Sequence, residues 1–179
     1  MRKLNQIMLL IMTVSLVTFT SCSSEDDNDG GNNNGDEFLT ATIDGNGFSA
    51  AQSPAVIIGA QSTNGILSVQ GGDNTGNTVS MAVMNYTGVG TYVTGDVISN
   101  TNFIQYLTIS GTPSTWASGL SSAALGTLMP GTIEVTSDDG TTVEGTFSFE
   151  GYNGADMTTK VVTNGEFKAI LDYLATRKV

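Results

Sequence analysis

Few residues of this 179-residue chain have side chains suited to catalysis. There is no histidine, which is the commonest general base and metal ligand in proteins. Two carboxyl groups about 5–10 Å apart can hydrolyse glycosidic bonds, and Glu134 and Glu144 could face each other across a predicted hairpin. The simpler interpretation is that both acids only solvate an exposed sheet face. We therefore predict no enzymatic activity and no catalytic residue.

Oxygen ligands offer a second kind of chemistry, because calcium binds to carboxylate and carbonyl oxygens. Two acidic segments are candidates, the loop 73–77 and the turn at Asp138 and Asp139. Neither has the spacing of a known calcium loop, and Asn, Asp and Gly are the ordinary residues of turns. We therefore expect no metal site and no cofactor.

Aromatic rings offer a third kind of chemistry, since a ring can stack on the face of a sugar. Trp116, Tyr106 and Tyr92 are candidates for such a ligand platform, with Tyr86 and Tyr152 as further rings. Aspartates and asparagines would then bind the sugar hydroxyls. A buried or edge-packed structural role is the alternative, and it is the favoured one for Trp116.

The amino-terminal segment has the order of a secretion signal. Two basic residues precede the apolar run 7–17, and small polar residues lead to Cys22, the only cysteine. The segment 20–22 resembles the lipobox of bacterial lipoproteins, although Phe19 stands where Leu, Val or Ile is usual. The resemblance implies removal of a signal peptide, residues 1–21, and lipid attachment at Cys22. An ordinary signal peptide is the alternative; an uncleaved anchor would need roughly 20 apolar residues.

The segment after Cys22 is acidic. Its start resembles the export signal that sends lipoproteins of Bacteroidota to the outer face of the outer membrane. The residues concerned are Ser23, Ser24, Glu25, Asp26, Asp27 and Asp29. A solvated tether is the simpler alternative. Because residues 22–37 cannot bury enough apolar surface to fold, we expect a disordered tether that holds the rest of the chain at a lipid anchor in the outer membrane.

The negative charge of the chain limits the kinds of molecule that it can bind. Losing Arg2 and Lys3 with the signal peptide leaves four basic and 17 acidic residues, a formal charge of −13. Such a surface repels nucleic acid, and no Lys/Arg cluster is present to bind phosphates. We expect no nucleic-acid partner. The remaining partners are the outer membrane, through the lipid anchor, and a glycan or an envelope protein.

Residues 38–179 have the pattern of an antiparallel β domain. Short alternating runs are separated by Gly and Asn turns, as in hairpins. In the clearest hairpin, residues 132–150, Phe147 and Phe149 share one face and Gly145 leaves room for a bulky neighbour. We therefore predict an all-β fold, an antiparallel β-sandwich or flattened barrel; an up-and-down barrel with an internal ligand cavity is the alternative. Further strands are expected at 39–43, 55–58, 66–70, 79–84, 88–93 and 103–109.

Two segments could be helical. Residues 118–129 hold apolar side chains at helical spacing between glycines, which predicts one short helix. In the tail, Phe167, Ile170, Leu171 and Leu174 fit a helical stripe, whereas a strand would align Phe167 with Leu171. Periodicity alone leaves the tail open between the two.

Five segments together carry a resemblance to a known family: 38–48, 90–92, 131–136 with Asp138, 143–149 and 162–167. They resemble a family of small Bacteroidota surface lipoproteins with a β-rich domain of unknown function. The resemblance covers nearly all of residues 38–170 and implies that 163–167 forms a final strand. It supplies no catalytic or binding residue.

These observations predict a cell-surface lipoprotein, lipid-anchored in the outer membrane and facing the cell exterior. Its domain would be a non-enzymatic binding module for a glycan, peptide or partner protein. The alternative is a structural component of the outer envelope without a soluble ligand.

Overall fold

The structure is a computed structural model that describes residues 37–51 and 59–171. The predicted signal peptide, Cys22, the acidic export segment, the tether up to residue 36, the strand expected at 55–58 and the tail beyond 171 lie outside the described residues. Strand makes up 62% of the structure and helix 5%. The predicted all-β, antiparallel fold is therefore confirmed.

The described strands join into one sheet of 11 strands, and a single short helix interrupts them. In chain order the elements are β1 (Phe38–Ile43), β2 (Asn46–Ser49), β3 (Gly59–Thr63), β4 (Ile66–Gly72), β5 (Thr78–Met84), β6 (Gly90–Thr94), β7 (Phe103–Thr108), β8 (Ser114–Ser118), α2 (Leu120–Leu125), β9 (Gly131–Asp138), β10 (Thr142–Asn153) and β11 (Thr158–Ile170).

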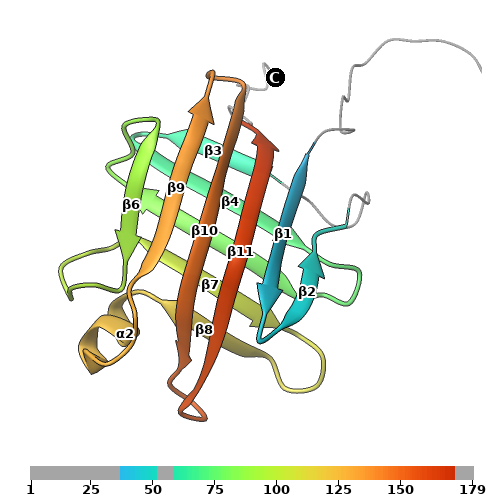
Figure 1. The fold of residues 1–179 in the computed structure, drawn as a ribbon, viewed down its shortest axis with the longest axis vertical. Helices are drawn as coiled ribbons and strands as arrows, with labels where there is room; N and C mark the ends of the chain where they lie inside the picture. Colours follow the sequence, from blue (N-terminus) through green and yellow to red (C-terminus); the bar gives the residue numbers. More distant parts are fainter. Residues whose placement is uncertain (1–36, 52–58, 172–179) are drawn as a thin grey trace, which may run out of the picture. The chain divides into compact units, whose positions relative to one another are not determined.

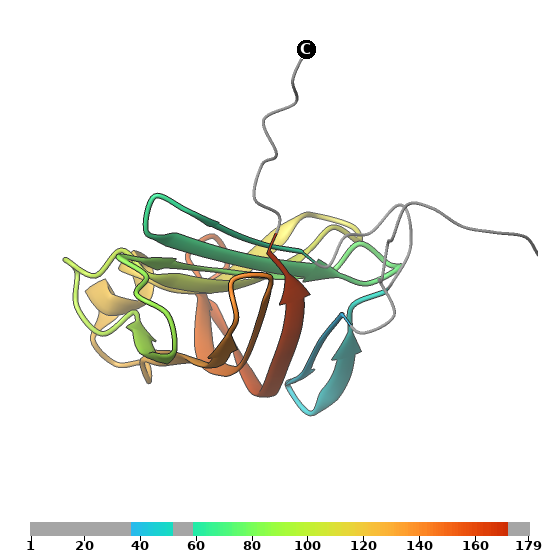
Figure 2. The ribbon, with the colours of Figure 1, turned by 90° about the horizontal axis from the view of Figure 1, so that it is seen from above.

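The sheet curls into a half-barrel with two facing layers (Figures 1 and 2). Its order is β2-β1-β11-β10-β8-β7-β5-β4-β3, and β9 pairs with both β10 and β6. The 12-residue β10 serves both layers: its first half pairs with β9, and Tyr152 near its end pairs with Ala117 of β8. The sheet folds over at this β10–β8 pairing, so that β3, β4, β5, β7 and β8 lie across the other strands (Figure 1).

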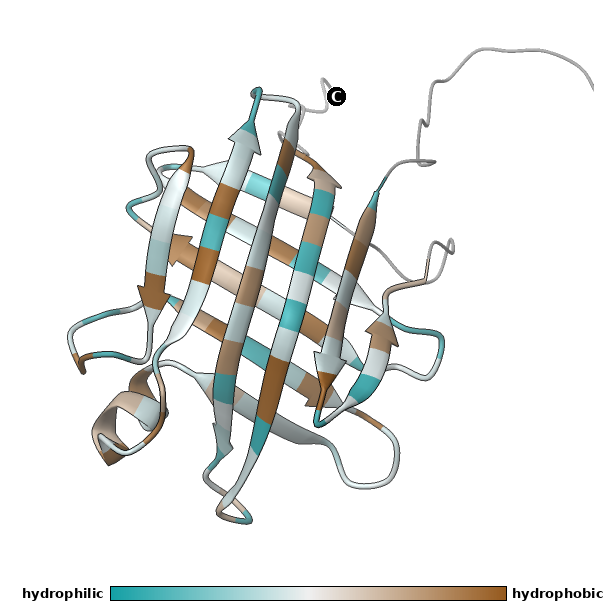
Figure 3. Cartoon of the chain, viewed as in Figure 1, coloured by the Kyte–Doolittle hydropathy of each residue, from teal (hydrophilic) through white to brown (hydrophobic). Residues whose placement is uncertain are grey.

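Alternation along each strand places one set of side chains between the layers, and the hydropathy pattern follows it (Figure 3). On β10, Phe147 and Phe149 are buried while Thr146 and Ser148 are exposed, as predicted. In the β10–β11 register Gly145 lies opposite Phe167, so the space predicted at this glycine is filled by a ring.

Gly145 and Phe167 belong to a reciprocal arrangement. On the same two strands, Gly165 lies opposite Phe147. A Cβ atom built on Gly145 would lie 2.7 Å from Cζ of Phe167, and one on Gly165 would lie 2.6 Å from Cε2 of Phe147. Each phenylalanine ring therefore covers the glycine of the neighbouring strand, a pairing that supplies the contacts the glycine lacks.

Of the two segments that could be helical, the first forms a helix and the second forms a strand. The helix predicted within 118–129 is α2, and it ends at Gly126 in the left-handed conformation, with φ 64°. The tail forms β11 up to residue 170, paired with β1 on one side and β10 on the other. The helical alternative is wrong over this stretch. Among the described residues no helix is long and apolar enough to cross a membrane.

Candidate functional site

Two of the predicted platform residues, Tyr106 and Trp116, face each other across β7 and β8. Their ring centroids lie 6.1 Å apart with planes inclined by 27°, and Phe48 meets Tyr106 edge-on at 6.2 Å. Only 8% of Tyr106 and 9% of Trp116 is exposed. The structure thus brings these two rings together between the layers rather than on an open face.

Trp116 is held at the edge of the core by polar contacts. Its Nε1 donates a hydrogen bond to Oγ1 of Thr158 at 2.8 Å. The ammonium group of Lys160 lies 4.8 Å from the centre of the ring and 2.8 Å from Oδ2 of Asp44. This is the edge-packed role that the sequence favours for the tryptophan.

Tyr92 pairs with a different ring, Tyr86, at a centroid distance of 5.7 Å. The Tyr92 hydroxyl donates to the carbonyl oxygen of Gly88 at 2.7 Å, and the Tyr86 hydroxyl donates to Asp138 at 2.6 Å. These contacts fasten the loop before β6 to the β9–β10 hairpin. The structure therefore divides the three candidate rings between two clusters.

Glu134 and Glu144, which could have faced each other across the hairpin, do not lie opposite each other. Glu134 lies opposite Thr146, and Glu144 lies opposite Ser137, because the hairpin closes with Val143 opposite Asp138 and its register then shifts by one residue between Glu144 and Gly145. Glu144 instead forms an ion pair with Lys168 on β11, 3.2 Å away.

The carboxylates considered as calcium ligands are bound within their own turns. Asp73 accepts hydrogen bonds from the backbone and side chains of Thr75 and Asn77, at 2.7–2.9 Å. Burial raises the pKa of Asp73, but these hydrogen bonds outweigh it and leave the pKa below its usual value. Asp139 likewise accepts from two backbone amides in the hairpin turn. Within residues 37–51 and 59–171, no three acidic side chains gather where they could hold a metal ion.

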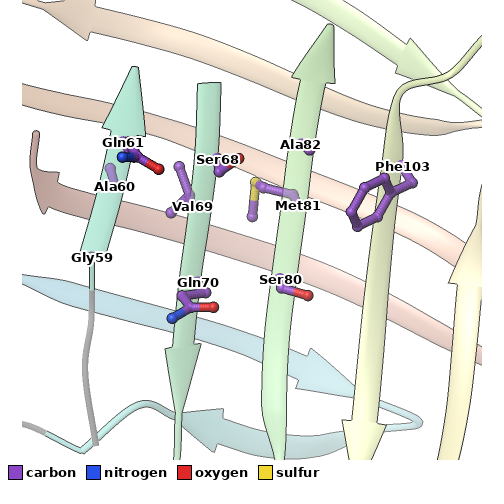
Figure 4. A pocket seen from close by; sticks show the side chains of 10 residues that line it. All are labelled: Gly59, Ala60, Gln61, Ser68, Val69, Gln70, Ser80, Met81, Ala82 and Phe103. Carbon is purple, nitrogen blue, oxygen red and sulfur yellow. The ribbon is translucent and has the colours of Figure 1, made fainter. Parts of the chain in front are cut away.

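A hollow of about 450 Å³ lies on the outer face of β3, β4, β5 and β7, with the other layer behind the sheet (Figure 4). Small side chains form its floor, since Ser68 and Ala82 lie opposite each other between Gln61 on β3 and Phe103 on β7. The next row across the strands contains Gln70 and Ser80, and Ser80 accepts a hydrogen bond from Gln105 at 3.0 Å.

The hollow is uncharged, and none of its lining residues is Asp, Glu, Lys or Arg. It offers amide and hydroxyl groups that both donate and accept hydrogen bonds, beside one aromatic ring. Its volume lies within the roughly 300–1,000 Å³ of small-molecule sites. Such a surface suits a neutral ligand rich in hydroxyl or amide groups.

The sequence analysis did not single out this hollow, although a signal for it exists. Residues 45–133 contain only two charged side chains, Asp73 and Asp96, in a chain with a net charge of −11. Alternating Gln and Ser in strands of that stretch, as at Ser68 and Gln70, would have indicated a polar but uncharged sheet face.

A family model described as "Domain of unknown function (DUF6252)" matches residues 36–171. Searches of curated proteins and of solved structures gave no match.

Proposed function

The chain belongs to the DUF6252 family, a domain of unknown function, and from the geometry of its β domain we propose that it is a non-enzymatic binding module for a neutral glycan. The observation that carries this proposal is the uncharged hollow on the outer face of β3, β4, β5 and β7.

The lining of the hollow favours a glycan over other ligand classes. Sugar hydroxyls both donate and accept hydrogen bonds, and the side chains of Gln61, Gln70 and Ser80 can do the same. Phe103 adds an apolar surface at the edge, against which a sugar ring can pack. A charged peptide or an anionic polymer would find no counter-charge in the lining, and the net charge of −11 repels polyanions.

We also propose that the module is a lipoprotein at the outer face of the outer membrane. The proposal rests on the signal-like segment before Cys22 and on the acids that follow it. Two or more acyl chains, at about 0.8 kcal/mol per buried methylene, give stable attachment, whereas a single chain gives marginal attachment. An external address would place the hollow where extracellular glycans are available.

A structural role in the envelope is the second candidate, and exposed apolar side chains near α2 favour it. The loop after β6 lies against α2, since a Cβ atom on Gly95 would be 2.5 Å from Oγ of Ser122. Large apolar side chains exposed on this loop, on α2 and just after it are Val97, Ile98, Leu120, Leu125 and Met129. Such clusters often mark contacts with other proteins.

The glycan proposal is tested by screening the purified protein against a glycan array and titrating the best hit. Ser68→Arg places a long charged side chain in the hollow and should abolish binding. Ser148→Arg is the matched control, because Ser148 is an exposed serine on the outer face of β10. Silence of the parent protein across the array, with a reproducible crosslink to an envelope protein, would favour the structural role instead. Equal binding by the parent and Ser68→Arg would exclude the hollow as the site.

A further inference from the structure

We propose that the ligand of the outer-face hollow is a linear chain of neutral sugars that lies across the strands, with two or three consecutive sugars in contact and one of them packed against Phe103. This inference rests on the binding function proposed above and adds the size and the orientation of the ligand. It is drawn from the shape of the hollow and from the register of the strands that form it.

The hollow is longer across the strands than along them (Figure 4). Its lining residues come from four neighbouring strands, β3, β4, β5 and β7. Neighbouring strands lie about 4.8 Å apart, so the hollow spans about 14 Å in this direction. Along β3, β4 and β5 the lining covers only residues 59–61, 68–70 and 80–82, which is about 7 Å at about 3.4 Å per residue.

The long dimension is greater than one sugar requires. From one glycosidic oxygen to the next, a sugar ring spans about four single bonds of about 1.5 Å, or about 6 Å. The length of about 14 Å therefore holds two or three sugars, whereas the width of about 7 Å admits a single chain. A monosaccharide would fill only part of the hollow.

Hydrogen-bonding side chains stand in two rows along the long dimension. In one row Ser68 lies opposite Gln61, and in the other Gln70 lies opposite Ser80. The rows are two residues, or about 7 Å, apart along the strands. A chain of sugars between them meets amide and hydroxyl groups on both sides, and these groups donate and accept hydrogen bonds as sugar hydroxyls do.

Phe103 stands at the β7 end of the hollow. It lies opposite Ala82, in the row that contains Ser68, and it is the only aromatic residue of the lining. The ring is half-buried, so part of it is open to a ligand. Because the ring is at one end, it can pack against one sugar of the chain while the others extend toward β3.

The neighbouring row on β4 and β5 disfavours a ligand that lies along the strands. Two positions beyond Ser68 and Ala82, Ile66 lies opposite Met84 on the same face of the sheet. These large apolar side chains offer a sugar hydroxyl no strong hydrogen-bonding group. A chain across the strands stays between the polar rows instead.

A series of ligand lengths tests the size of the site. The purified protein is titrated by calorimetry with linear oligosaccharides of glucose, of mannose and of N-acetylglucosamine, each with one to five sugars. We expect at least one series to bind. Its affinity should rise roughly tenfold or more from the monosaccharide to the trisaccharide, as for two or more added hydrogen bonds. The affinity should then stay constant, because further sugars lie outside the hollow.

Phe103→Ala tests the packing of one sugar against the ring. It should weaken binding of the trisaccharide roughly 5- to 10-fold, because apolar contact with the ligand is lost, whereas Phe103→Tyr keeps the ring and should keep the affinity. Leu107→Ala is the matched control, since Leu107 is a half-buried apolar residue on the same face of β7 and does not line the hollow. This control should bind as tightly as the parent.

NMR shifts of the backbone amides test the orientation. The trisaccharide should shift amides of β3 and β7 as well as those of β4 and β5. Shifts at Ile66 and Met84 with none on β3 would overturn the inference alone. So would equal affinity for one sugar and for three, or equal effects of Phe103→Ala and Leu107→Ala. Absence of binding at every length would overturn the proposed glycan function together with this inference.

Discussion

Replacing Gly145 by alanine tests the reciprocal pairing of glycine and phenylalanine between β10 and β11. The added methyl group would lie 2.7 Å from Cζ and 2.9 Å from Cε1 of Phe167 and would also meet the carbonyl oxygen of Glu134. Phe167 is 1% exposed, so the ring has little room to move, and the second obstacle is backbone. We expect overpacking to reduce the free energy of unfolding by about 1–3 kcal/mol.

The matched control for this variant is Gly47→Ala. A Cβ atom on Gly47 would meet nothing within 4 Å, and both glycines lie in strands. Replacing glycine by alanine also stabilises by roughly 0.4–1 kcal/mol, because it reduces the conformational freedom of the unfolded chain. Both variants share this gain where the native backbone tolerates alanine, so the difference between them isolates the contact with Phe167.

Urea unfolding followed by tryptophan fluorescence is the assay. Trp116 is the only tryptophan and is 9% exposed, so its emission should report loss of the core. Gly145→Ala should shift the midpoint to lower urea at an unchanged slope, and Gly47→Ala should stay within about 0.5 kcal/mol of the parent or slightly above it. If Gly145→Ala proved as stable as Gly47→Ala, the rings would not be confined as described.

Three further predictions concern the anchor, the charges and the buried hydroxyls. Cys22→Ala should release the protein from membranes and abolish labelling by a fatty-acid probe; a variant that stays membrane-bound would contradict the proposed lipid anchor. The pKa of Asp44 is lowered by hydrogen bonds from Lys160 and from the backbone amide of Val161, so its stabilisation is present above the pKa of about 3.9 of an unfolded aspartate and is lost as the pH falls through the folded value. Asp44→Asn should therefore lower the urea midpoint near pH 7 but not near pH 2. An equal fall of the midpoint at both pH values would show that the stabilisation does not come from the charge of Asp44. Ser118 is fully buried, with its Oγ 2.8 Å from Oγ1 of Thr94 and 3.1 Å from the amide nitrogen of Gly131; Ser118→Ala should cost about 1–3 kcal/mol, and a loss below about 0.5 kcal/mol in the same urea assay would refute that estimate.

Features that depend on neighbouring residues in the chain were predictable. Alternation along residues 132–150 correctly assigned the buried phenylalanines, and the glycine-bounded segment before β9 correctly indicated α2. These signals are local, because the side chains of a strand or a short helix repeat with a fixed period.

Features that depend on partners far along the chain were not predictable. Glu134 and Glu144 lie opposite other residues because of where the hairpin turn closes, and the one-residue bulge in the β9–β10 register is not indicated by the local pattern either. The tail fits a helical stripe, but hydrogen bonding to β1 and β10 on both edges determines a strand. Burial of Tyr106 follows from the stacking of two layers. The uncharged hollow was not predictable from local sequence either, because its side chains come from four different strands.

The pairing of β1 with β11 has a consequence for the order of folding. Phe38 lies opposite Lys168, so the first described strand finds its partner only after nearly the whole domain has been synthesised. Contacts between such distant segments form slowly, because the loop that joins them must close first. The half-barrel therefore cannot be completed while the ribosome is still adding β11. A chain that must thread through a membrane before it folds, as proposed for this lipoprotein, benefits from this delay, because its sheet stays incomplete until the last strand has emerged.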